Sequence, residues 1–425
     1  MRRSPVDHAR ATPGRIASIF PALLLSALIL SCPRGVDAQT WNGSVSDLWS
    51  NASNWTPNTV PNSTSASATV TNPTKNPVLI DDSPTIANLT VGASNSVNLD
   101  NGQSLTIAGG AGAGSLAIAG TLTLGSTGAD TDLILGGTSG STITLSGGGT
   151  LALSNNFANR IYSTTGDTLV NNAGNTIQGS GQIGINNSSF AFTLNNAGII
   201  NANQSAGLQI NPGSGTTNTG TIEATNGGTL FLGGNFTNTG TIQATGGSLV
   251  NLAGAGSSTI TNSGGLVQAT GSGALVNLGG GGTGTIVGGT LSSSGGGSFE
   301  NNGSGVLNGV TVSSGSTFTA LNGSTTTLMG TTTFQDTAIA INSTGATTNL
   351  ILSGGAAVEL TSGSSLTMSN SSNNRIYGSG SDTLTNDAGS TIQGSGQIGI
   401  GSSFAFTLNN AGVINANQST ALNVA

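Results

Sequence analysis

Histidine and cysteine are nearly absent from this chain of 425 residues, which contains one of each, His8 and Cys32. Both precede Gln39, so the rest of the chain has neither. Their absence there excludes a Ser-His-Asp triad, a Cys-His dyad and a zinc site with His or Cys ligands. It also excludes a disulfide, so another source of stability is needed, such as continuous strand stacking. The sequence predicts no metal site and no cofactor.

Charge is also scarce, because charged residues make up 5% of the chain, against roughly 25% in a typical globular protein. After residue 38 the basic residues are Lys75, Arg160 and Arg375, against thirteen acids, which gives a net charge of −10. A surface of this charge repels phosphate groups. We therefore expect no nucleic-acid partner.

Long apolar runs are missing, and the longest, IFPALLLSALIL at 19–30, is too short to span a bilayer. Arginines precede this run and small residues ending at Ala38 follow it, which is typical of a cleaved secretory signal peptide. Two alternatives are a twin-arginine signal at residues 2–3 and lipid attachment at Cys32. We expect residues 1–38 to be a signal peptide and the mature chain to have no transmembrane helix.

Short alternation of apolar and polar residues is abundant, as in LTI at 105–107, LTL at 122–124 and LAL at 151–153. Such alternation places the apolar side chains on one face of a strand. Glycine pairs between these segments supply the positive φ angles of tight turns. Disorder is the alternative for a composition so rich in Gly and Ser, but the recurring Leu, Ile and Val favour an ordered all-β chain.

A short repeat is superimposed on the alternation, because TNTGTIEATNGGTLFL at 217–232 is followed, after residues 233–236, by TNTGTIQATGGSLVNL at 237–252. Two or three short strands with glycine turns fill one coil of a parallel β-solenoid, a unit of about 20 residues. Asparagines at the coil corners are expected to stack into amide ladders along the axis. The residues that suggest such ladders are Asn171, Asn172, Asn195 and Asn196.

A much longer repeat also exists, because GDTLVNNAGNTIQGSGQIGI at 166–185 returns as SDTLTNDAGSTIQGSGQIGI at 381–400. DLILGG from Asp132 and NLILSGG from Asn349 extend the match upstream. The second copy is incomplete at residue 425. We divide the chain into a signal peptide (1–38), a Trp- and Pro-rich segment (39–77) and a β-solenoid (78–425) with large repeats at about 132–348 and 349–425.

The segment 39–77 differs from the rest because it holds all three tryptophans, Trp41, Trp49 and Trp55. Large aromatic side chains bury much area, so three of them can seal the open end of a strand stack. We therefore expect an N-terminal cap. The alternative is a stacking platform for a sugar ring.

Several of these motifs resemble a known family. GSVSDLWSNASNW, VLIDDSPTIANLTVG and the coils TIQGSGQIG, LNNAGxINA and NTGTIxAT resemble the β-strand-repeat proteins of Gram-negative bacteria, akin to autotransporter passengers and haemagglutinin-like adhesins. The resemblance implies an all-β, right-handed parallel β-solenoid with coils of roughly 20 residues, displayed outside the cell or on its outer surface. No aromatic-rich terminal region of the translocator type is present, so a translocator would be separate or missing from this sequence.

The motif NRIY contains the candidate ligand residues. Arg160 and Tyr162 are two apart on one strand, so both should point outward while Ile161 points inward. For Asp167, strand parity places the side chain on the same side as Leu169, whereas its position just after Gly166 suggests a corner, where it would face solvent. The second copy repeats the set as Arg375, Tyr377 and Asp382. These residues are either a surface Arg-Asp pair with an aromatic contact, or a ligand patch displayed twice to a surface glycan or matrix partner.

Clustered carboxylates are the enzymatic alternative. Polysaccharide lyases and hydrolases built on β-helices use Asp or Glu clusters with a basic residue, here Lys75 or Arg160. The candidate pairs are Asp81 with Asp82 and Asp130 with Asp132. We expect a structural or adhesin-like protein without catalytic activity, and the alternative is a polysaccharide-processing enzyme.

The predicted signal peptide has a direct test. If the chain is exported from a Gram-negative host, the mature protein should begin at Gln39, because the small residues of the cleavage site end at Ala38. N-terminal sequencing of the exported protein measures this. An intact residue 1 on the exported chain would contradict it.

Overall fold

The computed structural model describes residues 38–72, 74–109, 113–378, 380–401 and 404–425. The predicted signal peptide lies outside these residues apart from Ala38. Almost all regular structure in the described residues is β-strand, and helix occurs as single 3-10 turns such as η1 (Ala52–Asn54) and η3 (Ser188–Phe190). No helix among them is long and apolar enough to cross a membrane.

The strands form three sheets, and from β3 onward each strand pairs in parallel with the strand three places later. The first sheet contains, in order of pairing, β2 (Trp55–Thr56), β1 (Ala38–Trp41), β3 (Ser67–Val70), β6 (Asn88–Val91), β9 (Ala113–Ile118), β12 (Thr142–Ser146), β15 (Thr168–Asn171), β18 (Phe192–Asn196), β21 (Gly213–Asn218), β24 (Gly234–Asn238), β27 (Ser258–Thr261), β30 (Thr283–Val287), β33 (Ser304–Asn308), β36 (Thr325–Met329), β39 (Thr348–Leu352), β42 (Asn374–Tyr377), β45 (Gly396–Ile398) and β48 (Leu422–Val424). The second sheet contains β4 (Val78–Ile80), β7 (Ser96–Leu99), β10 (Thr121–Leu124), β13 (Thr150–Leu153), β16 (Thr176–Gly179), β19 (Ile199–Ala202), β22 (Thr221–Ala224), β25 (Thr241–Thr245), β28 (Leu266–Thr270), β31 (Thr290–Ser294), β34 (Thr311–Val312), β37 (Thr331–Phe334), β40 (Ala357–Leu360), β43 (Thr383–Asn386) and β46 (Thr407–Asn410). The third sheet contains β5 (Thr85–Ile86), β8 (Ser104–Ile107), β11 (Thr131–Leu135), β14 (Asn159–Ser163), β17 (Gly181–Ile183), β20 (Leu208–Ile210), β23 (Thr229–Leu232), β26 (Leu249–Asn251), β29 (Leu275–Asn277), β32 (Ser298–Asn301), β35 (Thr317–Ala320), β38 (Ala338–Ile341), β41 (Ser365–Met368), β44 (Thr391–Gln393) and β47 (Val413–Asn415).

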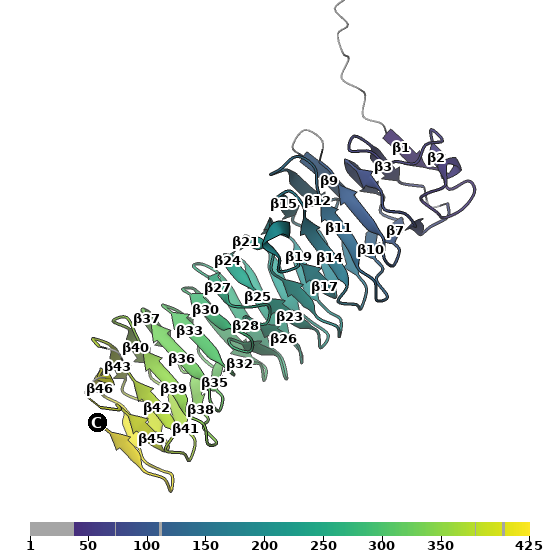
Figure 1. Cartoon of the computed structure of the whole chain (residues 1–425). Helices are drawn as coiled ribbons and strands as arrows, with labels where there is room; N and C mark the ends of the chain where they lie inside the picture. The colour runs from purple at the N-terminus through teal and green to yellow at the C-terminus, as the bar shows by residue number, and fades with distance from the viewer. Residues whose placement is uncertain (1–37, 73, 110–112, 379, 402–403) are drawn as a thin grey trace, which may run out of the picture. The chain divides into compact units, whose positions relative to one another are not determined.

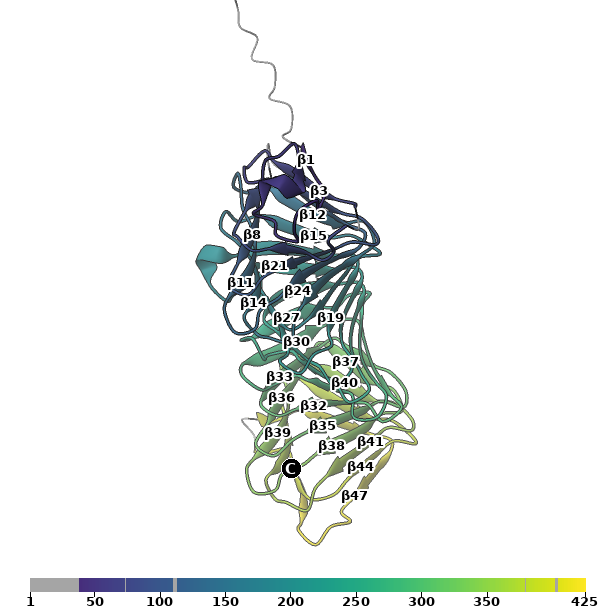
Figure 2. The ribbon, with the colours of Figure 1, turned by 90° about the vertical axis from the view of Figure 1, so that its right-hand side faces the viewer.

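This arrangement is the parallel β-solenoid that the sequence predicts. It has about 15 turns, with one strand of each sheet in every turn. Figures 1 and 2 show the turns stacked in chain order, from purple at β1 to yellow at the C-terminus. Side chains alternate between the core and the surface along the strands, as in β10, where Leu122 and Leu124 are buried. The register step is not constant, because Thr221 pairs with Thr241 in one coil whereas Thr121 pairs with Thr150 in another.

The corner between β16 and β17 shows why glycine recurs in the motif TIQGSGQIG. Gly179 and Gly181 have φ angles of 124° and 145°, in the left-handed region that favours glycine. A Cβ atom on Gly179 would lie 1.9 Å from the carbonyl oxygen of Leu153 in the preceding coil. The equivalent Gly394 meets the carbonyl oxygen of Met368 in the same way. Each of these corners therefore requires glycine for its angle and for the close approach.

The two large repeats do not lie on the same sheets. NRIY of the first copy is strand β14 of the third sheet, whereas NRIY of the second copy is strand β42 of the first sheet. The two strands are 28 places apart, which is not a multiple of three. Both strands nevertheless lie near the long midline of the solenoid in Figure 1. In Figure 2, β14 and β39, the strand that pairs with β42, both lie on the left side of the solenoid. The three sheets therefore wind gradually around the long axis of the solenoid between the first copy and the second.

The predicted tryptophan cap is present. Trp41, Trp49 and Trp55 are buried, and their rings make edge contacts with centroid distances of 5.1 Å and 4.6 Å. Trp55 lies on β2, which pairs antiparallel with β1 and covers the free edge of the first sheet. Since the three rings are at most 1% exposed, they leave no face on which a sugar can stack.

A ladder of buried asparagine amides follows the inner edge of the first sheet. Asn171, Asn196, Asn218, Asn238 and Asn262 each donate to or accept from the next one, with N–O distances of 2.7 Å. Their remaining amide hydrogens reach backbone carbonyls at the same corner, as from Asn218 Nδ2 to the carbonyl of residue 220. The predicted ladder is confirmed at Asn171 and Asn196, whereas the prediction is wrong for Asn172 and Asn195, whose side chains lie outside the ladder.

We expect Asn218→Ala to destabilise the solenoid by about 1–3 kcal/mol, because it leaves the buried Oδ1 of Asn238 without a donor. Asn172→Ala is the matched control, because Asn172 is exposed one residue beyond the ladder and should cost less than about 0.5 kcal/mol. Denaturant unfolding measures both. Equal costs would show that the ladder contributes nothing specific.

Candidate functional site

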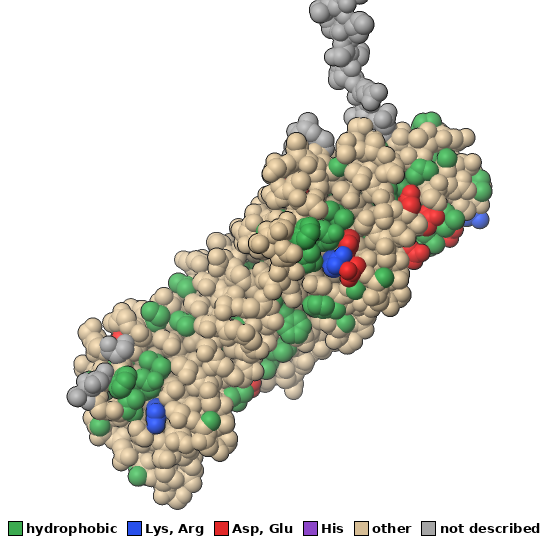
Figure 3. Space-filling model, in the orientation of Figure 1, with side chains coloured by type: hydrophobic (Ala, Val, Ile, Leu, Met, Phe, Trp, Pro, Cys, Tyr) green, Lys and Arg blue, Asp and Glu red, His purple; other side chains and the backbone are tan. Residues whose placement is uncertain are grey.

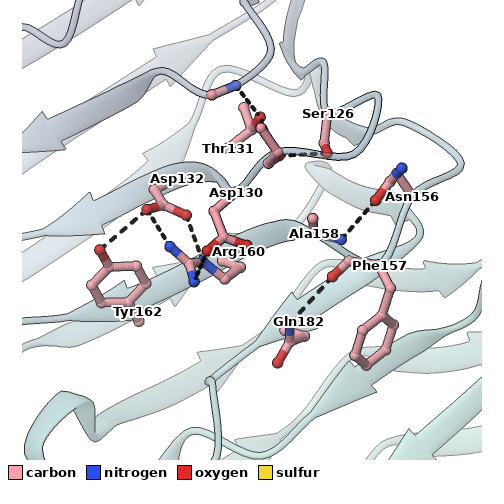
Figure 4. A network of polar contacts seen from close by, with 12 residues as sticks. Ser126, Asp130, Thr131, Asp132, Asn156, Phe157, Ala158, Arg160, Tyr162 and Gln182 are labelled. Atoms are coloured by element: carbon pink, nitrogen blue, oxygen red, sulfur yellow. Dashed lines mark hydrogen bonds and ion pairs between the residues drawn. The ribbon is translucent and has the colours of Figure 1, made fainter.

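The first NRIY motif places a compact polar cluster on the outer face of β14. The guanidinium of Arg160 donates to both oxygens of Asp132, from Nε and from Nη2, at 2.7 Å each (Figure 4). Its Nη1 lies 2.5 Å from Oδ2 of Asp130. The hydroxyl of Tyr162 donates to Oδ2 of Asp132 at 3.3 Å. A bidentate guanidinium-carboxylate pair is the strongest common form of charge-assisted hydrogen bond.

The strand register accounts for this geometry. Asp132 on β11 is the direct partner of Arg160 on β14, so their side chains leave the same face of the third sheet. Between the two outward side chains of β14, Ile161 is fully buried, as strand parity predicts. The positions of Arg160 and Tyr162 thus follow from the alternation that builds the core.

The charge states follow from the contacts. The hydrogen bonds to Asp132, with the charges of Asp132 and Asp130, raise the pKa of Arg160 above its ordinary value. Burial and the charge of Asp132 raise the pKa of Tyr162. The guanidinium is therefore charged and the phenol neutral at physiological pH, and both acids contact the one cation of this cluster.

Asp167 does not face solvent, so the placement by strand parity, on the same side as Leu169, is confirmed and the corner interpretation is wrong. It is 0% exposed, and its carboxylate accepts from the backbone N of Ser141 (2.9 Å) and the hydroxyls of Ser163 (2.8 Å) and Thr165 (2.7 Å). Asp382 is likewise buried and accepts from the backbone N of Ala356 at 2.8 Å. Both carboxylates stabilise a corner, because they accept from buried backbone N–H groups and, for Asp167, also from two hydroxyls.

Each tyrosine of the two copies has an aromatic partner that sequence reasoning missed. Tyr162 contacts Phe190 edge-on at a centroid distance of 5.3 Å, and Tyr377 contacts Phe404 in the same way at 5.5 Å. Phe404 is 45% exposed. The signal was available, since both phenylalanines open the repeated FAFTLNNAG motif at the same position of each copy.

The second cluster lacks the acids of the first. Residues 126–135 read STGADTDLIL and residues 343–352 read STGATTNLIL, so the copies differ there at two positions. These are the two acids that contact Arg160, and Asn349 occupies the place of Asp132 beside Arg375. Figure 3 shows a basic side chain between acidic ones over β14 and another, without adjoining acids, over β42.

Among the described residues, Arg375 makes no hydrogen bond or ion pair, and its Nε is buried without a partner. The Oδ1 atom of Asn349 is buried without a partner as well. In the first copy the equivalent atoms, Arg160 Nε and Asp132 Oδ1, bond to each other. The duplicated site therefore exists in one form whose cation is paired with two acids and in another whose cation has no partner among the described residues.

The other predicted acid pair lies beside the cap. Asp81 accepts from the backbone N of Ser50 at 2.9 Å and from its hydroxyl at 2.6 Å. Burial raises the pKa of Asp82, and the charge of Asp81 raises it further. Lys75 is exposed and forms no ion pair with the described acids. The described residues contain no group of three or more Asp, Glu, His or Cys side chains that could hold a metal ion.

Comparison of the chain with models of known families, with curated proteins and with solved structures found no match.

The two copies predict unequal effects on stability. Arg160→Ala should destabilise the protein by about 1–3 kcal/mol, because it leaves the Asp132 carboxylate, 8% exposed, without its cation. Arg375→Ala should cost less than about 0.5 kcal/mol, because Arg375 has no partner to lose among the described residues. Denaturant unfolding measures both, and Arg160→Ala with Asp132→Asn should recover part of the loss. Equal costs in the two copies would contradict this.

Proposed function

We propose that this protein is an exported, surface-displayed β-solenoid that acts as a structural or adhesin-like component and not as an enzyme. The observation that carries the proposal is the state of the carboxylates. Asp130 and Asp132 are engaged by Arg160, and Asp81 is held to the cap by Ser50. Glycoside hydrolysis requires two carboxyl groups that flank one bond. Of the four candidate acids only Asp82 remains, with a raised pKa, and one carboxyl group does not supply the two that the reaction requires.

The surface chemistry supports the same function. The outward positions of the strands are mostly Thr, Ser, Asn and Gln, as in TIQG of β16 and TIQAT of β25. A hydroxyl- and amide-rich surface with few charges offers many weak polar contacts, and repetition along a solenoid adds their effects. This favours contact with a surface glycan or matrix over catalysis at one point.

The cellular setting is part of the proposal. We propose export by the signal peptide at 1–38, display on the outer surface of a Gram-negative bacterium and a separate translocator. The solenoid is proposed to be right-handed, as parallel strand crossovers are in nearly all proteins. The resemblance of the coils to β-strand-repeat adhesins supports this setting.

Two measurements on the full chain test the proposal. Expressed in a Gram-negative host with its translocator, the protein should be cut by protease added to intact cells, because it lies outside them. The purified chain should not shorten polygalacturonate or a neutral galactan. Retention inside the cell would contradict the display, and chain shortening that Asp82→Asn or Asp132→Asn abolishes would establish the enzyme.

A further inference from the structure

We propose that Arg375, with the aromatic pair Tyr377 and Phe404, binds the carboxylate of an acidic sugar chain of the uronate class. The equivalent cluster at Arg160 does not bind it, because its own acids occupy the cation. The inference names a ligand class for the displayed surface and so rests on the proposed function. Its test uses purified protein, so that failure of export and failure of binding are distinguishable.

The first copy shows which chemical group fits. A planar carboxylate, that of Asp132, lies against Arg160 with two hydrogen bonds of 2.7 Å, and a second carboxylate, that of Asp130, lies against Nη1. The outward residues of the second copy keep the arginine and the tyrosine but replace both acids by Thr347 and Asn349. A guanidinium without a carboxylate is thus complementary to a carboxylate supplied from outside.

The guanidinium is accessible along one edge. Nε of Arg375 is buried and has no partner. Its two Nη atoms are not buried, and neither forms a hydrogen bond with a described residue. The ligand carboxylate would therefore take the Nη edge, as Asp130 approaches Nη1 of Arg160 in the first copy. Beside it, the ring of Phe404 is 45% exposed and contacts Tyr377, which gives the apolar face of a sugar ring a surface to cover.

The local charge favours an anion although the chain as a whole is acidic, with a net charge of −7. The strands on both sides of Arg375 in the first sheet, β36, β39, β45 and β48, contain no acid. Asp382, the acid of the same corner, is 1% exposed and already accepts from the backbone. More distant acids act weakly, because salt screens charges beyond about 8 Å at physiological ionic strength.

A polymer ligand also fits the arrangement of the site. Gln397 is the direct partner of Arg375 in the next coil, and Asn423 follows it, so outward amides continue the column along the stack. The first copy has the same order, Arg160, Gln182 and Gln209. A saccharide chain lying along this column would meet the cation and then amide groups, which is the mixture that binds carboxylates and hydroxyls together.

The experiment compares two oligosaccharides and four variants by calorimetry with the purified full chain. The probes are a galacturonate oligomer and its methyl ester, which has the same sugars without the charge. We expect the acid form to bind at one site per chain and the ester to bind at least about tenfold more weakly. Circular dichroism and thermal unfolding establish that each variant is folded.

Arg375→Ala should weaken binding about ten- to a hundredfold, and Arg375→Lys should weaken it less, because lysine keeps the charge but not the planar pair of donors. Asn349→Asp should weaken binding similarly, because it restores the acid of the first copy beside the cation. The converse pair, Asp130→Thr with Asp132→Asn, should free Arg160 and raise the stoichiometry from one site to two.

The contrary results are equally definite. No binding of the galacturonate oligomer to the folded wild type, equal affinity for the ester, or full affinity in the folded Arg375→Ala variant would each overturn the inference. A second site that fails to appear in the folded Asp130→Thr, Asp132→Asn variant would show that the acids do not mask Arg160. Binding that fails in purified protein while cells still display the chain would refute the ligand and leave the proposed function standing.

Discussion

The parallel backbone ladder between each strand and the strand three places later is the interaction on which the rest of this structure depends. With no cysteine after residue 38, the ladder and the core that it encloses have to hold the coils together. The same ladder decides which outward side chains are neighbours, since it places Asp132 beside Arg160 and Asn349 beside Arg375. One register therefore sets both the core and the chemistry of the surface.

Most of the fold could be predicted because burial alternates with a period of two and the corners carry glycine. The coil length was harder to predict. The most similar coils, at 217–232 and 237–252, suggest a constant short step, but the step from Thr121 to Thr150 is longer than the step from Thr221 to Thr241. Corner loops tolerate such insertions at a small entropic cost. To assign a strand to its sheet, one has to count every strand that precedes it. A match between two sequence segments does not give that count.

The candidate site was predictable where strand parity alone applies and was left open where a corner interpretation competed with it. Arg160 and Tyr162 lie on a strand, so their outward direction followed from Ile161. Asp167 lies at a corner, where hydroxyls of Ser163 and Thr165 close over its carboxylate. The step from Asp132 to Arg160 is longer than the short repeat seen at 217–252, so no periodic argument joined the two residues.

The two copies of NRIY are 28 places apart in the order of strands, in a fold that uses three strands per turn. Each whole copy therefore advances the strand-to-sheet assignment by one, and in a tandem array the fourth copy would be the first to place its strands on the same sheets as the first copy. Gain or loss of a copy by recombination would change more than the length of the stack. It would move every later side chain to a different sheet. The winding of the sheets between copies would then decide which equivalent side chains still face the same side of the solenoid.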